Sequence, residues 1–562
     1  MTHQTLIFLF TLISTVLSVE DPIIELPTGQ ILGRQTTTST NTAYYVFEKI
    51  PYATPPVGPL RFKAPQPAQP WEGVLNTTYL DTSCYQQQGE WPSDSEDCLF
   101  VNVYTPALPE EDENASFPVM LFIHGGAFTS GRSLDYRPDL LIEDEVIIVT
   151  INYRLGVFGF LSTQDEIIPG NNGLKDQRLA IQWTHENIHL FGGDPERITI
   201  FGESAGSVSV GFHLLDQTSQ GLFSGAILES GSSLCPWAIQ REARKIAFGT
   251  AAIRNSTFSD SDDSAALFDY LQSLDAADLD QTAQEYLQSV ATLLDQDLAV
   301  LVYTPVIEVK NPDAFITRKM YGLFKAGSFL QVPIIIGINS EESLLFNPDP
   351  NVVQIVLQEF DNNLELIVPI DMPITNSDQN LEMATSIRDI YTNGEPFGAN
   401  LGDGIRYASD NGFNRGIIKH AALSSSLTDV YFYQFSYDSL PGNVSVVYDG
   451  AGSVGHAEEL AYLFCVTILG CSLDDFVEND VVTSQRLIKL WTNFAKYRNP
   501  TPEASDLLQN VTWPKVSLED GGEFLYLDIN VDLEVRSNPK GEAMEKWDSL
   551  CRLDKRNKLH QN

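Results

Sequence analysis

One short stretch, residues 197–215, sets the strongest limit on how this chain folds. Its first part, Ile198–Phe201, is apolar and β-branched and predicts a strand, whereas the apolar residues after position 205 recur at helical spacing. Between them, Gly202 and Gly206 flank Ser204, and side chains at the two glycine positions would clash in so tight a turn. The pattern predicts a sharp turn that exposes the Ser204 hydroxyl as a nucleophile. A plain helix cap formed by the same serine is the alternative.

Apolar runs alternate with helical stretches over much of the remaining sequence. The runs lie at 118–126, 145–156, 225–230 and 332–342, with a further one at 430–437. Such an alternation is typical of an α/β fold, in which a mostly parallel central sheet is flanked by helices. We therefore predict a single large α/β domain over residues 19–562. Within it, the helical and acidic stretches 240–330 and 345–425 are predicted to be caps inserted over the sheet.

The first 18 residues are typical of a secretory signal peptide, because their apolar run is too short to span a membrane. No later stretch reaches 18 apolar residues and the tail is polar, so we predict a secreted, extracellular protein without a membrane anchor. Glycosylation sequons that fit this compartment lie at Asn76, Asn114, Asn255, Asn443 and Asn510. The net charge of −41 argues against nucleic acid and anionic membranes as partners.

The chain has six cysteines, and secretion makes disulfides plausible. Six cysteines allow fifteen connectivities, so their spacing alone does not assign the pairs. Closing the short loop between Cys84 and Cys98 would contribute about 3 kcal/mol to stability in the chain-entropy model.

A serine hydroxyl needs a base to take its proton, and histidine is the usual one. Of the eight histidines, His420 and His456 lie on the C-terminal side of Ser204 at suitable places, and we favour His456 because it lies in a glycine-rich loop after the run at 430–437. The acid that orients this base should follow an earlier strand, where Glu341 and Glu342 are both candidates. An ordinary solvated helix start is the alternative interpretation of that pair.

The oxyanion formed during acyl transfer needs backbone N–H donors. One is expected from Ala205, the residue after the serine, and the glycine-rich loop HGGAF at 124–128 should supply others from Gly126 and Ala127.

Taken together, several motifs of this chain resemble the type-B carboxylesterase and cholinesterase family of the α/β-hydrolase fold. The motifs are SEDCLFVNVYTP (95–106), HGGAF (124–128), NYRLGVFGFL (152–161), GNNGLKDQRLAIQW (170–183), FGGDPERITIFGESAG (191–206), GINSEES (337–343) and GHAEELAYLF (455–464). Several of them look similar to secreted arthropod esterases. The resemblance covers nearly the whole mature chain and implies an α/β-hydrolase with helical caps.

The resemblance also implies roles for individual residues. It assigns the acid to Glu342 and the base to His456, and it matches the oxyanion donors to Gly126, Ala127 and Ala205. It pairs Cys84 with Cys98, and it gives Glu203 a part in placing the histidine and water. The chain departs from the family pattern at Ala127, where glycine is common. Its short loop between the first two cysteines makes choline esters doubtful, and Glu203 argues against the juvenile-hormone esterase subgroup, which usually has glutamine there.

We therefore predict a secreted serine carboxylesterase that acts on small-molecule esters through a Ser-His-Glu triad and an acyl-enzyme. We expect no cofactor and no metal, and a monomer or homodimer. The alternative is a catalytically weak or inactive relative that binds or sequesters a ligand or mediates adhesion, because a shared fold does not prove activity.

Overall fold

The computed structural model describes residues 21–86, 94–109, 115–291, 301–372, 374, 376–439, 446–466, 471–518 and 522–556, with side chains up to 550. The predicted signal peptide, the sequons at Asn114 and Asn443 and the side chain of Cys551 lie outside these residues. Within the described residues, no helix combines the length and apolar character needed to cross a bilayer.

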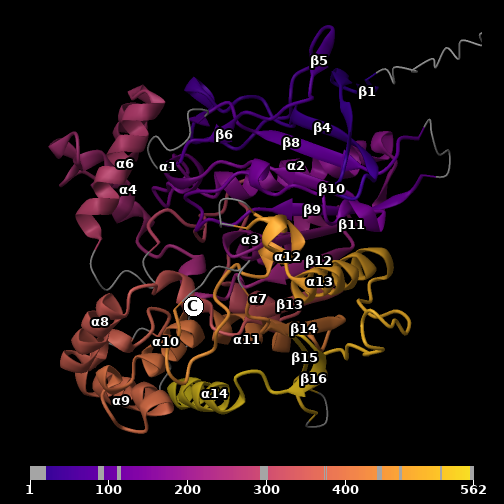
Figure 1. Ribbon diagram of the computed structural model, residues 1–562. Helices are drawn as coiled ribbons and strands as arrows, with labels where there is room; N and C mark the ends of the chain where they lie inside the picture. The colour runs from indigo at the N-terminus through magenta and orange to yellow at the C-terminus, as the bar shows by residue number, and fades with distance from the viewer. Residues whose placement is uncertain are drawn as a thin grey trace, which may run out of the picture.

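A large twisted sheet of 11 strands runs through the molecule (Figure 1). In spatial order its strands are β16 (Leu533–Ser537), β15 (Leu525–Ile529), β14 (Val430–Phe435), β13 (Ile334–Asn339), β12 (Gly225–Glu229), β11 (Gly193–Glu203), β9 (Phe117–Ile123), β10 (Ile147–Ile151), β8 (Phe100–Thr105), β4 (Ala43–Pro51) and β3 (Arg34–Thr37). Every neighbouring pair from β15 to β10 is parallel, whereas the pairs at both ends of the sheet are antiparallel. The mostly parallel sheet is therefore confirmed, and each predicted apolar run forms one of its strands.

The alternation of side chains along β9 explains why helices cover both faces of the sheet. Val119, Leu121 and Ile123 pack in one core cluster, with α2 (Asn172–Asn187), α3 (Ala205–Leu215), α7 (Met320–Lys325) and α11 (Arg415–Ser424). Met120 and Phe122 point the other way, into a second cluster with α12 (Leu460–Leu463) and α13 (Glu478–Tyr497). Burying each such side chain stabilises the fold by roughly 1.5–3 kcal/mol.

The two predicted insertions are helical, and Figure 1 shows them beside the sheet. The first carries α4 (Ala243–Ala252), α5 (Ser264–Ser273) and α6 (Ala276–Val290). The second carries α8 (Pro350–Asn362), α9 (Ser377–Thr392) and α10 (Leu401–Ser409), and it shares a small core with the C-terminal helix α14 (Gly541–Arg556).

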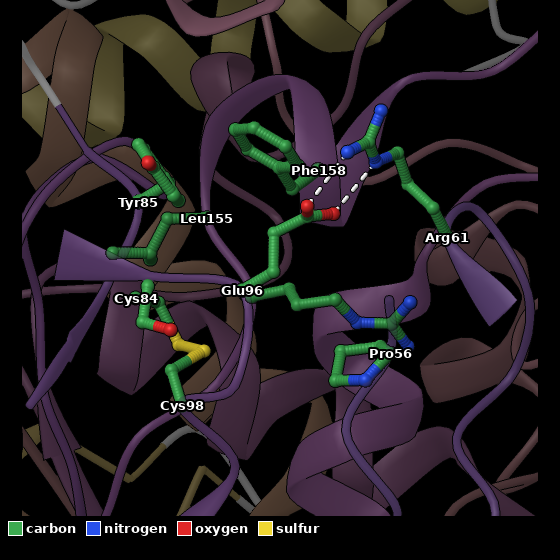
Figure 2. Close-up of a pocket in the computed structure, with 10 residues that line it drawn as sticks. Pro56, Arg61, Cys84, Tyr85, Glu96, Cys98, Leu155 and Phe158 are labelled. Atoms are coloured by element: carbon green, nitrogen blue, oxygen red, sulfur yellow. Dashed lines mark hydrogen bonds and ion pairs between the residues drawn. A yellow bond between two sulfur atoms is a disulfide. The ribbon is translucent and has the colours of Figure 1, made fainter. Parts of the chain in front are cut away.

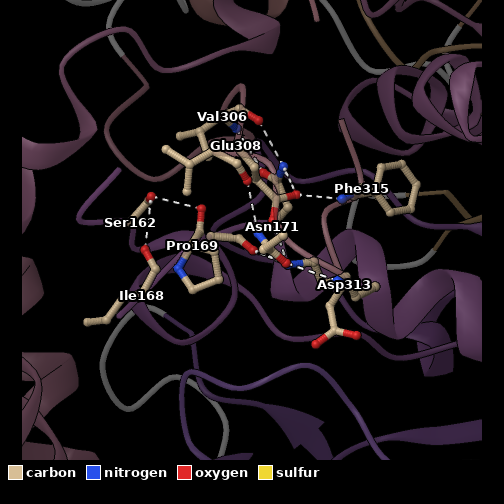
Figure 3. A network of polar contacts seen from close by, with 12 residues as sticks. Ser162, Ile168, Pro169, Asn171, Val306, Glu308, Asp313 and Phe315 are labelled. Atoms are coloured by element: carbon tan, nitrogen blue, oxygen red, sulfur yellow. Dashed lines mark hydrogen bonds and ion pairs between the residues drawn. The ribbon is translucent and has the colours of Figure 1, made fainter. Parts of the chain in front are cut away.

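A buried polar network ties the segment after α6 to the start of α2 (Figure 3). Glu308 lies 2.7 Å from Lys175 Nζ and accepts hydrogen bonds from Asn171 Nδ2 at 2.9 Å and Phe315 N at 2.8 Å. Breaking such a buried pair by removing one partner typically costs about 3–5 kcal/mol. The first insertion is therefore firmly attached to the sheet-covering helix.

Disulfides join Cys84 to Cys98 and Cys465 to Cys471. Cys235 is buried and carries a free thiol. Near the N-terminus, β1 (Ile23–Leu26) and β2 (Gly29–Leu32) form an antiparallel pair outside the large sheet.

Candidate active site

Ser204 sits on the turn between β11 and α3, with backbone angles of φ 56° and ψ −121°. A Cβ atom at Gly202 would lie 2.5 Å from the carbonyl oxygen of Ile123 on β9, and one at Gly206 would lie 1.9 Å from it. Both positions therefore require glycine. Ser204 stands at the N-cap position of α3, but its side chain makes no capping hydrogen bond to the helix, so the serine does not serve as a side-chain cap. Its hydroxyl is instead left at the C-terminal end of a parallel strand, where ligands bind in such sheets.

His456 and Glu342 meet although they are far apart in the sequence. Glu342 follows β13 and His456 lies in the loop after β14, so the parallel strands bring both to the same edge of the sheet. His456 Nδ1 lies 2.7 Å from Glu342 Oε2, and Glu342 is fully buried. The Glu341 carboxylate instead accepts a hydrogen bond from Gly452 N at 2.8 Å. His420 is buried in the core against the Ser232 hydroxyl at 2.9 Å.

The second ring nitrogen of His456 faces Glu203. Its Nε2 atom lies 3.0 Å from Glu203 Oε1, although the geometry is not that of a hydrogen bond. Among the described residues, Nε2 has no hydrogen-bond partner, Ser204 included. Burial lowers the pKa of His456, but Glu203 and then Glu342 outweigh it and raise this pKa to about 10. The two flanking carboxylates therefore favour the imidazolium form in this arrangement.

More carboxyl groups surround this pair than the sequence predicted. Glu229, at the end of β12, is fully buried, and burial together with the nearby Glu459 raises its pKa well above the usual value. Burial, followed by the charges of Glu203 and Glu342, likewise raises the pKa of Glu459. Since a buried carboxylate without a cation is costly, Glu229 and Glu459 favour their protonated forms.

The glycine-rich loop packs directly against the turn that carries Ser204. A Cβ atom at Gly125 would lie 3.1 Å from that of Ser204. In the described structure, no acceptor bonds the backbone N–H groups of Gly126, Ala127 or Ala205. They are therefore available to an oxyanion formed at this position. Ala127 has a φ of 56°, a left-handed conformation that glycine adopts more readily.

Two phenylalanine rings enclose the imidazole of His456. Phe413 and Phe346 have ring centroids 4.7 and 5.4 Å from it and stack on each other with an interplanar angle of 11°. Phe413 belongs to a π-helical turn, Asp410–Asn414, between α10 and α11. Such turns are frequent at functional sites, but no pattern in the sequence predicts one here.

The model of the carboxylesterase family matches residues 20–547. The chain belongs to this family. It is 33% identical to juvenile hormone esterase of Tribolium castaneum, over 91% of this chain and 88% of that protein, and 33% identical to esterase FE4 of Myzus persicae, over 90% and 89%. A solved juvenile hormone esterase of Manduca sexta, with OTFP covalently attached, superposes with a TM-score of 0.80 at 26% identity and covers 95% of this chain and 100% of that chain.

These matches confirm the predicted family and the α/β-hydrolase fold, and they identify the chain as a carboxylic ester hydrolase. Sequence reasoning missed the Glu229 and Phe413 contacts. A glutamate within an apolar strand is the one signal that could have drawn attention to Glu229.

A small pocket of about 10 Å³ in this carboxylesterase lies beside the Cys84–Cys98 disulfide rather than at Ser204 (Figure 2). Arg61 and Glu96 line it and form an ion pair at 2.6 Å, so their charges are already neutralised. The cavity therefore gives no indication of a second binding site.

The sequons that the structure describes differ in exposure. Asn76 and Asn510 are exposed, whereas Asn255 is half-buried. Asn76 and Asn510 are thus accessible to a glycan.

Proposed function

We propose that this chain is a secreted serine carboxylesterase that uses Ser204, His456 and Glu342 as a catalytic triad. The observation that carries the proposal is the turn at Ser204, where the close contacts at Gly202 and Gly206 leave no room for side chains and the serine follows directly on the end of β11. The 2.7 Å contact between His456 Nδ1 and Glu342 supports it, because a carboxylate that orients an imidazole makes it a competent base.

In the proposed reaction, His456 Nε2 takes the proton of Ser204 as Oγ bonds to the ester carbonyl carbon. The N–H groups of Gly126, Ala127 and Ala205 donate to the oxyanion, and each such donor is typically worth about 10²–10³ in rate. His456 then passes its proton to the leaving alcohol, which leaves an acyl-enzyme. Water attacks the acyl-enzyme and gives a proton to His456, and the acid departs as this proton returns to Ser204.

Glu203 has a different part in this proposal. In the reacting complex the imidazole turns its Nε2 atom from Glu203, 3.0 Å away, to the serine hydroxyl. The Glu203 carboxylate stays close and stabilises the imidazolium that forms in both steps. The carboxylate charge thus assists the steps in which His456 holds a proton.

Secretion is supported by the N-terminal apolar run, the sequons and the two disulfides, which persist in oxidising compartments. Expression of the full chain in a secretory host should place the protein in the medium with a mass above that of the polypeptide. Retention of the protein inside the cells would contradict secretion.

Hydrolysis of a short-chain aryl ester by the purified protein tests the chemistry. Ser204→Ala should lower kcat by about 10⁶, the loss seen when a triad serine is removed. Ser207→Ala is the matched control, since this buried serine lies on α3 and donates to Gly231 O. Equal activity of wild type and Ser204→Ala would refute the triad, and a folded but inactive wild type would favour a ligand-sequestering protein.

A further inference from the structure

Asn339, the last residue of β13, connects the turn that carries Glu342 with the loop that carries His456. The residue is fully buried. Its backbone N–H donates to Glu342 Oε1 at 2.7 Å, which leaves Oε2 of the same carboxylate for His456 Nδ1. The backbone of Asn339 therefore determines which oxygen faces the imidazole.

The side chain of Asn339 reaches the other segment. Its Nδ2 atom donates to the carbonyl oxygen of Gly455, the residue before His456, at 2.7 Å. Nδ2 also donates to Glu459 Oε2, three residues beyond His456, at 2.5 Å. An amide has two N–H donors, and here each is used on a different side of the histidine. A carbonyl oxygen only accepts, so the amide nitrogen has to face Gly455.

From this arrangement we infer that Asn339 is a positioning residue for ester hydrolysis, because it holds the His456 loop at a set distance from Glu342. The inference rests on the triad proposed above. Asn339 does not touch substrate. It acts through the imidazole, whose displacement by about 1 Å can cost 10²-fold in rate.

No other residue type of this size meets both demands. Aspartate would place an acceptor against Gly455 O and Glu459. Alanine would leave Gly455 O with only the long 3.5 Å bond from Glu458 N and, among the described residues, Glu459 Oε2 with no donor. The backbone bond from Asn339 to Glu342 would survive either substitution. Substituting the Asn339 side chain therefore perturbs the loop that carries His456 while the backbone bond to Glu342 remains.

Asn339→Ala should lower kcat for a short-chain aryl ester about 10²-fold while KM stays within about threefold, since no substrate contact is lost. The low-field proton resonance of the His456 Nδ1–H should weaken or move as well. Asn493→Ala is the matched control: this buried amide on α13 donates to Pro500 O at 3.0 Å, away from the site, and its loss should leave both readouts unchanged.

If the alanine variant fails to fold, a second pair of substitutions tests the same hydrogen bond by exchanging its donor and its acceptor. Asn339→Asp keeps the size of the side chain but should be slower than wild type, and adding Glu459→Gln should recover part of kcat because the new amide can donate to the aspartate. A double variant no faster than Asn339→Asp would remove Glu459 from the proposal.

The inference is overturned if folded Asn339→Ala keeps kcat within about threefold of wild type and an unchanged low-field resonance. The proposed triad fails differently, by a Ser204→Ala variant that remains active. Measuring both variants in one series keeps the two failures apart.

Discussion

Glu458 offers a direct test of how burial controls the acids of this site. Its side chain is 4% exposed and accepts a hydrogen bond from the backbone N–H of Gly455. Burial is the main cause that raises its pKa from the ordinary 4.5 to about 8, and the charges of Asp438 and Glu342 add to it. The hydrogen bond from Gly455 N–H lowers the pKa of Glu458 but does not offset the effect of burial.

The sign of the effect on stability follows from these values. The folded protein holds the Glu458 proton more tightly than the unfolded chain, so the contribution of Glu458 to stability is fully present below pH 4.5 and is lost as the pH rises to about 8. At 1.36 kcal/mol per pH unit, the whole fall amounts to about 5 kcal/mol. Glu458→Gln is neutral at every pH and still accepts from Gly455, so this fall should be absent from the variant.

Urea unfolding followed by tryptophan fluorescence at pH 5 and pH 9 measures the difference. The free energy of unfolding of Glu458→Gln minus that of wild type should be about 4 kcal/mol higher at pH 9 than at pH 5, because only wild type loses stability over this range. Glu382→Gln on α9 removes the same charge from an exposed side chain and should show no such pH dependence. If the relative stability of Glu458→Gln differed by less than about 1 kcal/mol between the two pH values, the argument from burial would be refuted.

Two further substitutions test the electrostatics and backbone of the site. Because Glu203 raises the pKa of His456, Glu203→Gln should move the acidic limb of the kcat/KM profile to lower pH, and a limb that stays in place or moves up would contradict this. Ala127→Gly should raise the free energy of unfolding by about 1 kcal/mol, because the left-handed conformation costs alanine about that much and glycine little. A lower thermal unfolding midpoint for Ala127→Gly would contradict the strain argument.

The central strands were predictable because they are buried on both faces and read as continuous apolar runs. The sequence signal fails where a buried strand carries polar residues. Asn102 lies in β8 and is fully buried, yet it looks polar in the sequence. Its amide donates to the hydroxyls of Ser133 and Thr150, so its burial depends on partners far along the chain. Periodicity within a short window cannot contain that information.

Some residues of the site could be predicted from local sequence, whereas others could not. The turn at Ser204 follows from local sterics, since Gly202 and Gly206 are needed wherever the strand and helix approach so closely. The choice of Glu342 over Glu341 depended on a family resemblance, because adjacent glutamates differ only in the direction the turn gives them. The contact between Glu203 and Nε2 of His456 depends on side-chain rotamers, which no local pattern specifies.

The same topology that gathers the proposed triad also gathers negative charge. Glu203 and Glu229 are register partners at the ends of the parallel strands β11 and β12, and Glu342 follows the next strand, β13. Carboxyl ends of parallel strands meet at one edge, so these acids are brought together regardless of their separation in sequence. His456 enters this group with two carboxylates in contact, so its protonation is a property of the whole group. Neutralising any acid whose charge acts on His456 should therefore lower its pKa, and the size of the shift should follow the closeness of that acid to the imidazole.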